Sequence, residues 1–123
     1  MNFFKHFRDL LSFTNLRFEE KEIVFYSEGE QYWPYLKEIV LSFLNLSNKK
    51  VCYVSSSFKD PGLFLKHKNL KIFCIGDKSV RHHFFKNLNC KMLIMTMPDL
   101  DNYHIVKSNN NVHYVYTQHS LNS

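Results

Sequence analysis

The chain has 123 residues, of which 45% are hydrophobic and 16% aromatic, and it carries a formal charge of +5 at pH 7. This length suits one domain with a single hydrophobic core, and the composition excludes a disordered chain. The charge favours an anionic partner, but the basic residues are scattered along the chain rather than gathered into a run, so we expect no nucleic-acid binding.

The first predicted element is a short amphipathic helix over residues 3–13. Phe3, Phe7 and Leu10 recur there at helical spacing, with charged residues between them. The apolar face of this helix needs a partner, which is this domain, another half of the protein or a membrane surface. We therefore divide the chain into residues 1–21, the helix with its lead-in, and residues 22–123, a folded domain.

The rest of the chain alternates between strands and helices. Pro34 suits the first turn of a helix, and apolar residues recur at helical spacing from there to Asn45. Ser79 can cap a second helix, which follows a strand that stops at Gly76. The predicted strands are compact apolar runs, at residues 23–26, 51–54, 72–75, 92–95 and 112–117.

These apolar runs are nearly continuous, whereas strands with one solvated face alternate apolar and polar residues. Continuous runs indicate strands that are buried on both faces, as in parallel sheets covered by crossover helices. We therefore predict an α/β fold with a Rossmann-like, doubly wound, mostly parallel five-stranded sheet. Its core should include one residue from each strand, namely Val24, Val54, Phe73, Ile94 and Val115.

The three cysteines, Cys52, Cys74 and Cys90, lie in or beside apolar runs and form no close pair. We expect buried free thiols, which are typical of a reducing compartment. No apolar run approaches the roughly 18 residues that a membrane-spanning helix needs, and the apolar start of the chain lacks a signal-peptide cleavage site. Together these observations predict a cytoplasmic protein.

Ligands of open parallel sheets bind outside the carboxyl ends of the strands, where loops and helix amino-termini converge. The loops that follow the predicted strands hold much of the unusual polar content of this chain. We expect their polar residues to bind substrate, and the candidates are Ser27, Glu28, Gly29, Ser55, Ser56, Asp99, Asp101, Asn102 and His104.

Several common catalytic motifs are absent from the sequence. Neither G-x-G-x-x-G nor the phosphate loop occurs, which argues against ordinary dehydrogenases and phosphate-loop ATPases, and no G-x-S-x-G elbow supports a serine hydrolase. Asp99 and Asp101 form an Asp-x-Asp pair, with which some nucleotide-sugar transferases hold a divalent cation, but the same residues also suit turn chemistry or helix capping. The histidines lack zinc-site spacing, so we expect neither a metal nor another cofactor.

His119 is the candidate catalytic residue. It follows the last predicted strand, at the edge of the sheet where a nucleotide or an acceptor would bind. A neutral imidazole at this place can act as a general base. A histidine in an ordinary surface loop would occupy the same position.

Six segments of the sequence together resemble the amino-terminal half of the CDP-glycerol glycerophosphotransferase-like family, which includes teichoic-acid primases and polymerases. The resemblance extends from about Glu22 to Ser123. Its segments are Tyr26-Ser27-Glu28-Gly29, Gln31-Tyr32-Trp33-Pro34, Tyr53-Val54-Ser55-Ser56, Asp60-Pro61-Gly62, Met95-Thr96-Met97-Pro98-Asp99-Leu100-Asp101-Asn102, and Val112-His113-Tyr114-Val115-Tyr116 with His119-Ser120-Leu121.

The resemblance implies one half of a two-domain, glycosyltransferase-B-like enzyme. Such enzymes move glycerol phosphate from CDP-glycerol onto a lipid-linked or polymer acceptor at the membrane. His119 is similar to the histidine of the family's His-Gly motif, which is assigned a base role, although Ser120 replaces the glycine. The CDP-linked donor would bind mainly to a second domain, so this half would handle the acceptor and would be inactive alone.

The sequence ends six residues beyond the last predicted strand, without a helix to cover that end of the sheet. We therefore expect a second domain to be missing, and an apolar patch at which the fragment self-associates. Two other functions stay open, because a fold does not settle function. They are a non-catalytic α/β binding or interaction domain and a stand-alone nucleotide-binding regulator.

Overall fold

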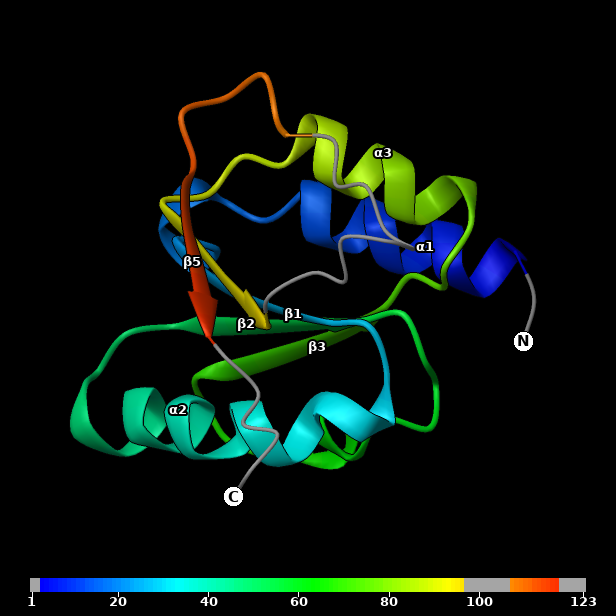
Figure 1. The fold of residues 1–123 in the computed structure, drawn as a ribbon. Helices are drawn as coiled ribbons and strands as arrows, with labels where there is room; N and C mark the ends of the chain where they lie inside the picture. Colours follow the sequence, from blue (N-terminus) through cyan, green and yellow to red (C-terminus); the bar gives the residue numbers. More distant parts are fainter. Residues whose placement is uncertain (1–2, 97–106, 118–123) are drawn as a thin grey trace.

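The computed structural model describes residues 3–96 and 107–117, and it shows a five-stranded parallel sheet between two layers of helices (Figure 1). The strand order is β3-β2-β1-β4-β5. The strands are β1 (Ile23–Ser27), β2 (Val51–Ser55), β3 (Leu70–Cys74), β4 (Met92–Thr96) and β5 (His113–Thr117). The helices are α1 (Phe3–Thr14), α2 (Trp33–Leu46) and α3 (Ser79–Asn87), with 3-10 turns η1 (Phe18–Glu20), η2 (Glu30–Tyr32) and η3 (Pro61–Phe64).

The sheet is parallel at each of its four strand pairings. The central strand β1 pairs with β2, Ile23 opposite Val51, and with β4, Ile23 opposite Met92. All five residues of β1 and of β2 are buried, because helices cover both faces of these strands. The predicted doubly wound, Rossmann-like α/β fold is therefore confirmed.

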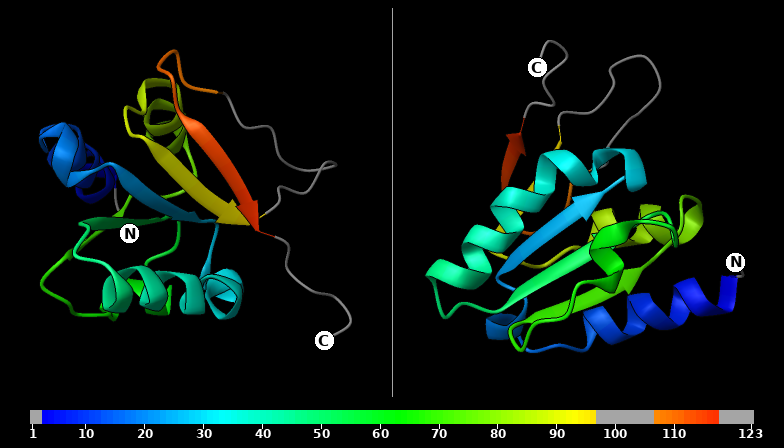
Figure 2. Two further views of the ribbon diagram at one scale, coloured as in Figure 1. Left: turned by 90° about the vertical axis from the view of Figure 1, so that its left-hand side faces the viewer. Right: turned by 90° about the horizontal axis from the view of Figure 1, so that it is seen from below.

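Helices lie on both faces of the sheet (Figure 2). Each face carries a hydrophobic cluster of its own. Under α1 and α3, the largest buried side chains include Tyr26 and Phe84, and under α2 and η3 they include Phe25, Tyr53 and Leu36. Alternate residues of each strand point to opposite clusters, as the period of a strand requires.

The core prediction holds for four of the five residues named from the sequence. Val24, Val54, Phe73 and Ile94 are buried, whereas Val115 is only half-buried. Val115 belongs to β5, which lies at the edge of the sheet with a strand on one side only. It packs against the cluster under α2 from that position.

Helix α1 packs on this domain, which is one of the three partners that the sequence left open for its apolar face. Phe13 is 3% exposed, and its ring centroid lies 5.5 Å from that of Phe73 and 5.3 Å from that of Phe84. Asp9 Oδ2 accepts a hydrogen bond of 2.8 Å from the backbone N–H of Cys74, on the edge strand β3. Helix α1 thus lies beside α3 in the same layer and bonds to the carboxyl end of the edge strand β3.

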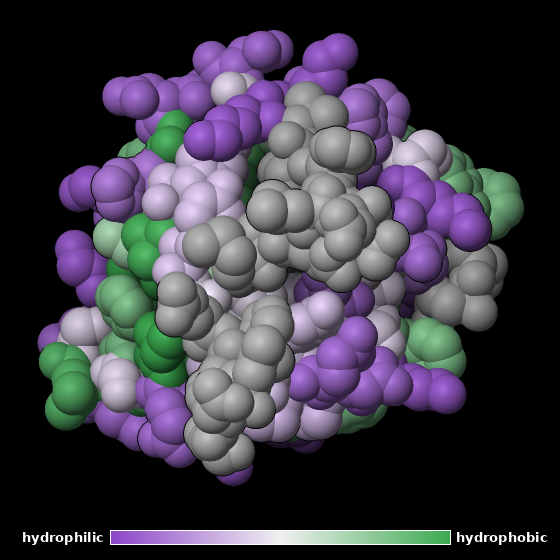
Figure 3. Space-filling model, in the orientation of Figure 1, coloured by the Kyte–Doolittle hydropathy of each residue, from purple (hydrophilic) through white to green (hydrophobic). Residues whose placement is uncertain are grey.

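The outer side of α1 stays apolar, with four of its hydrophobic side chains exposed: Phe3, Phe4, Phe7 and Leu11. On the face seen in Figure 3, hydrophobic side chains gather near the left and right margins, with hydrophilic ones around them. Among the described residues, no helix combines the length and the apolar character that crossing a membrane requires.

The cysteines are buried free thiols, as predicted. Burial is the main cause that raises the pKa of Cys52 and of Cys90 to about 12, and it also raises the pKa of Cys74. One helix start differs from the prediction. Lys78 stands at the N-cap of α3, where its side chain makes no capping bond, and Ser79 is the first helical residue.

Candidate functional site

A cavity of about 650 Å³ lies at the carboxyl edge of the sheet. Its walls come from the segments that follow β1, β2 and β3, from the first turn of α3 and from the amino-terminal half of α1. The polar side chains in these walls include Glu28, Ser56, Ser57, Asp77 and Arg81. This is the edge at which parallel α/β sheets bind their ligands.

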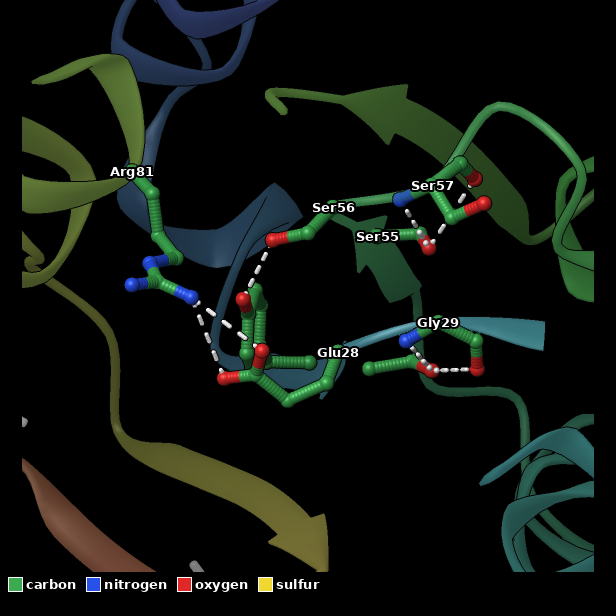
Figure 4. Close-up of polar contacts among 8 residues, drawn as sticks. Glu28, Gly29, Ser55, Ser56, Ser57 and Arg81 are labelled. Atoms are coloured by element: carbon green, nitrogen blue, oxygen red, sulfur yellow. Dashed lines mark hydrogen bonds and ion pairs between the residues drawn. The ribbon is translucent and has the colours of Figure 1, made fainter. Parts of the chain in front are cut away.

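An ion pair connects two walls of the cavity. Arg81 Nη1 lies 3.1 Å from Glu28 Oε1 and 3.4 Å from Glu28 Oε2, and about a quarter of each side chain is exposed. Figure 4 shows the two side chains pointing toward each other, Arg81 from α3 and Glu28 from the end of β1. Partial exposure limits the energy of such a pair to about 1 kcal/mol, so its chief effect is to orient both groups.

Ser56, another substrate-binding candidate from the sequence, also lies in the cavity wall. Its Oγ forms a short hydrogen bond with the phenol oxygen of Tyr26 (Figure 4). Burial, followed by the nearby carboxylate of Glu28, raises the pKa of Tyr26 far above its usual range. The phenol therefore stays protonated at neutral pH and cannot act as a base that would activate Ser56. Ser56 is thus suited to bind a ligand hydroxyl, and Tyr26 does not activate it as a nucleophile.

The other predicted residues of these two loops are buried and bonded within their own loops. Ser27 Oγ donates to the carbonyl of Gly29 and accepts from its N–H, at 2.9 and 3.2 Å. Ser55 Oγ accepts from the N–H of Ser57 at 3.1 Å. These contacts shape the loops that present Glu28 and Ser56, and a direct role of Ser27, Gly29 and Ser55 in substrate binding stays a prediction.

Asp60 is a buried carboxylate, which the sequence analysis named only within the resemblance segment Asp60-Pro61-Gly62. It accepts hydrogen bonds from Tyr53 Oη at 2.9 Å, from Ser55 Oγ at 2.7 Å and from the N–H of Gly62 at 2.9 Å. A Cβ on Gly62 would lie 2.4 Å from the Tyr53 ring, so only glycine fits there. The signal in the sequence was Asp60-Pro61-Gly62, an N-cap followed by proline in the first turn.

This network fixes the loop after β2. Burial, followed by the charge and hydrogen bond of Asp60, raises the pKa of Tyr53, so its hydroxyl remains a donor to the carboxylate. Ser55 connects Asp60 to Ser57, whose Oγ in turn donates to Glu30 Oε1 at 2.8 Å. Asp60 therefore supports the cavity wall from beneath without lining it.

His6 of α1 is a cavity residue that sequence reasoning missed. Its imidazole packs on Gly76, where an added Cβ would lie 2.5 Å from His6 Nδ1. Gly76 has a φ of 71°, in the left-handed region that favours glycine. Burial is the main cause that lowers the pKa of His6 from 6.5, so the imidazole is neutral at pH 7. Only the docking of α1 brings His6 to this edge, so no local motif pointed to it.

No protein-family model, curated protein or solved structure gives a significant match to this chain.

Five of the predicted site residues lie outside the described part of the chain: Asp99, Asp101, Asn102, His104 and His119. Their roles stay predictions. Within residues 3–96 and 107–117, no three His, Cys, Asp or Glu side chains come together in a way that could hold a metal ion. The described part of the site is thus a cavity lined by polar and aromatic side chains.

Proposed function

We propose that this domain is the acceptor-side half of a nucleotide-dependent transferase similar to the CDP-glycerol glycerophosphotransferases, and that the cavity holds the acceptor. The observation that carries the proposal is the convergence of two resemblance segments on one cavity. Glu28 comes from the segment at residues 26–29 and Ser56 from the segment at residues 53–56, and both line the cavity. A third segment, residues 60–62, supports the same wall through Asp60.

In the proposed reaction, an acceptor hydroxyl attacks the β-phosphorus of a CDP-linked donor. A bond forms between the acceptor oxygen and phosphorus, the bond from phosphorus to the bridging oxygen breaks, and CMP leaves with that bond's electrons. His119 takes the hydroxyl proton. Removal of a general base of this kind costs about 10² to 10⁴ in rate.

In the proposed enzyme, the donor and the acceptor bind mainly to different domains. The sequence has neither dinucleotide fingerprint nor phosphate loop, and the donor would bind mainly to a second domain. The present domain alone would then show no turnover. The acceptor is lipid-linked or a polymer, so the enzyme would work in the cytoplasm, at the inner face of the membrane.

The test is an NMR titration of the ¹⁵N-labelled chain with acceptor analogues and, separately, with CMP and CDP-glycerol. We expect acceptor analogues to shift the amide signals of Glu28, Ser56 and Arg81, and the cytidine nucleotides to leave them unchanged. Strong binding of CDP-glycerol at these residues, or no response to any acceptor analogue, would contradict the proposal. In the complete gene product, His119→Ala should lower kcat and leave donor affinity nearly unchanged.

A non-catalytic interaction domain is the second candidate, and one observation favours it. Phe58, Phe64 and Ile72 are 49%, 71% and 42% exposed and lie together around a smaller apolar groove near the edge strand β3. Exposed apolar groups gathered at one place mark interaction surfaces. If Phe64→Ala abolishes a biological effect that His119→Ala leaves intact, the interaction role is the correct one.

A further inference from the structure

We infer that the cavity at the carboxyl edge binds an uncharged sugar ring at the end of the acceptor, and not a phosphate group. This inference rests on the proposed function, since it names the chemical class of the acceptor end that the cavity takes.

The first observation is the charge balance of the cavity walls. Among the described residues, the walls carry two carboxylates, Glu28 and Asp77, and two cationic side chains, Lys78 and Arg81. Burial lowers the pKa of His6, which disfavours a positive charge on this imidazole. A phosphate ester would therefore meet as many negative as positive groups, and it would compete with Glu28 for Arg81. Sites built for phosphate instead present an excess of positive charge or of donors.

The second observation is the mixture of donors and acceptors. A phosphate ester offers acceptors almost alone, whereas each sugar hydroxyl donates one hydrogen bond and accepts others. Ser56 and Ser57 supply hydroxyls at the wall, and Glu28 supplies a carboxylate that its contact with Arg81 holds in place. A carboxylate has about four lone-pair positions, so Glu28 can accept from ligand hydroxyls while it stays paired with Arg81.

The third observation is the presence of large apolar groups in the same walls. The phenyl rings of Phe3 and Phe58 line the cavity, and they are 56% and 49% exposed. A sugar ring has an apolar face of C–H groups that can cover such a ring while its hydroxyls reach the polar wall. A phosphate group has no such face, and it would leave both rings in contact with water.

The experiment compares neutral and anionic probes of similar size on the same chain. The ¹⁵N-labelled protein is titrated with methyl β-glucopyranoside, with glycerol 3-phosphate and with inorganic phosphate. We expect the glucoside to shift the amide signals of Glu28, Ser56 and Phe58, with an affinity that changes less than about twofold between low and high salt, since no net charge is neutralised. The two anions should leave these signals in place.

Two phenylalanine variants supply a matched pair. Phe58→Ala should weaken glucoside binding about tenfold, which corresponds to about 1.4 kcal/mol. Phe64→Ala removes another exposed ring, one that lies in η3 and does not line this cavity, and it should change nothing. Thermal unfolding of both variants checks that the fold persists.

The outcomes separate this inference from the proposed function. If the anions shift the cavity signals and the glucoside does not, the inference is wrong and the acceptor site stands. An equal loss of glucoside binding in both phenylalanine variants also overturns it. If no probe reaches the cavity, the acceptor site itself is refuted.

Discussion

Replacing Asp60 by alanine should be the most damaging single polar change in the described part of the domain. The carboxylate accepts from Tyr53, Ser55 and the N–H of Gly62, and Tyr53 and Ser55 are fully buried. The variant would leave three donors without this acceptor, away from water. Each buried unsatisfied group costs about 1 to 3 kcal/mol, so the three together should cost about 3 to 9 kcal/mol. That loss is a large part of the roughly 5 to 15 kcal/mol that stabilises a typical domain.

Urea unfolding followed by circular dichroism measures this loss, and a double-mutant cycle assigns it. Tyr53→Phe removes one donor and should cost about 1 kcal/mol in the native protein. In the Asp60→Ala background the same change should cost much less, because the hydroxyl no longer has its partner. Asp77→Ala, which removes an exposed carboxylate, is the control and should have little effect. A loss below about 1 kcal/mol for Asp60→Ala, or additive costs in the cycle, would refute the role given to this network.

Three further results are expected. Gly76→Ala should destabilise the domain by more than the roughly 1 kcal/mol that a left-handed backbone costs alanine, because the new Cβ would also displace His6. A smaller loss of stability in urea unfolding would contradict this packing. The pKa of His6 is lower in the folded state than its unfolded value of 6.5, so its contribution to stability is present above pH 6.5 and is lost as the pH falls below that value. His6→Gln should flatten this part of the curve of unfolding free energy against pH, and an unchanged curve would contradict the lowered pKa. In the native protein, Cys52, Cys74 and Cys90 should react slowly with a thiol reagent at pH 8, since burial raises their pKa values. In urea all three should react rapidly. Fast reaction of all three without denaturant would show that the thiols are accessible in the folded protein.

Much of the fold could be predicted because its signals are local. The apolar run of β1 and the helical spacing that follows Pro34 each specify one element within a few residues. Continuous apolar runs then indicate burial on both faces, which only a sheet covered by helices on both sides provides. The edge position of β5, which leaves Val115 half-buried, depends on strand order, and no single strand sequence encodes that order.

The candidate site was predicted in part for the same reason. Glu28 and Ser56 directly follow predicted strands, so the rule that ligands bind at carboxyl ends was enough to select them. Arg81 lies close after the predicted strand at residues 72–75 but was not singled out, because its partner Glu28 is 53 residues away in the sequence. Asp60 was named only within a segment of the resemblance, since a sequence does not show that its carboxylate is buried among three donors.

By itself, the sequence determined the α/β class, the order of helices and strands, the burial of the thiols and the edge of the sheet at which to look. These properties depend on short-range periodicity and on turn residues, which act within a few positions of the chain. Only the tertiary structure decided that α1 packs beside α3, that His6 thereby rests on Gly76, and that Arg81 pairs with Glu28. Those contacts join residues about 50 to 70 positions apart, and the physical reason is that long-range packing selects one arrangement among several that satisfy the local pattern equally well.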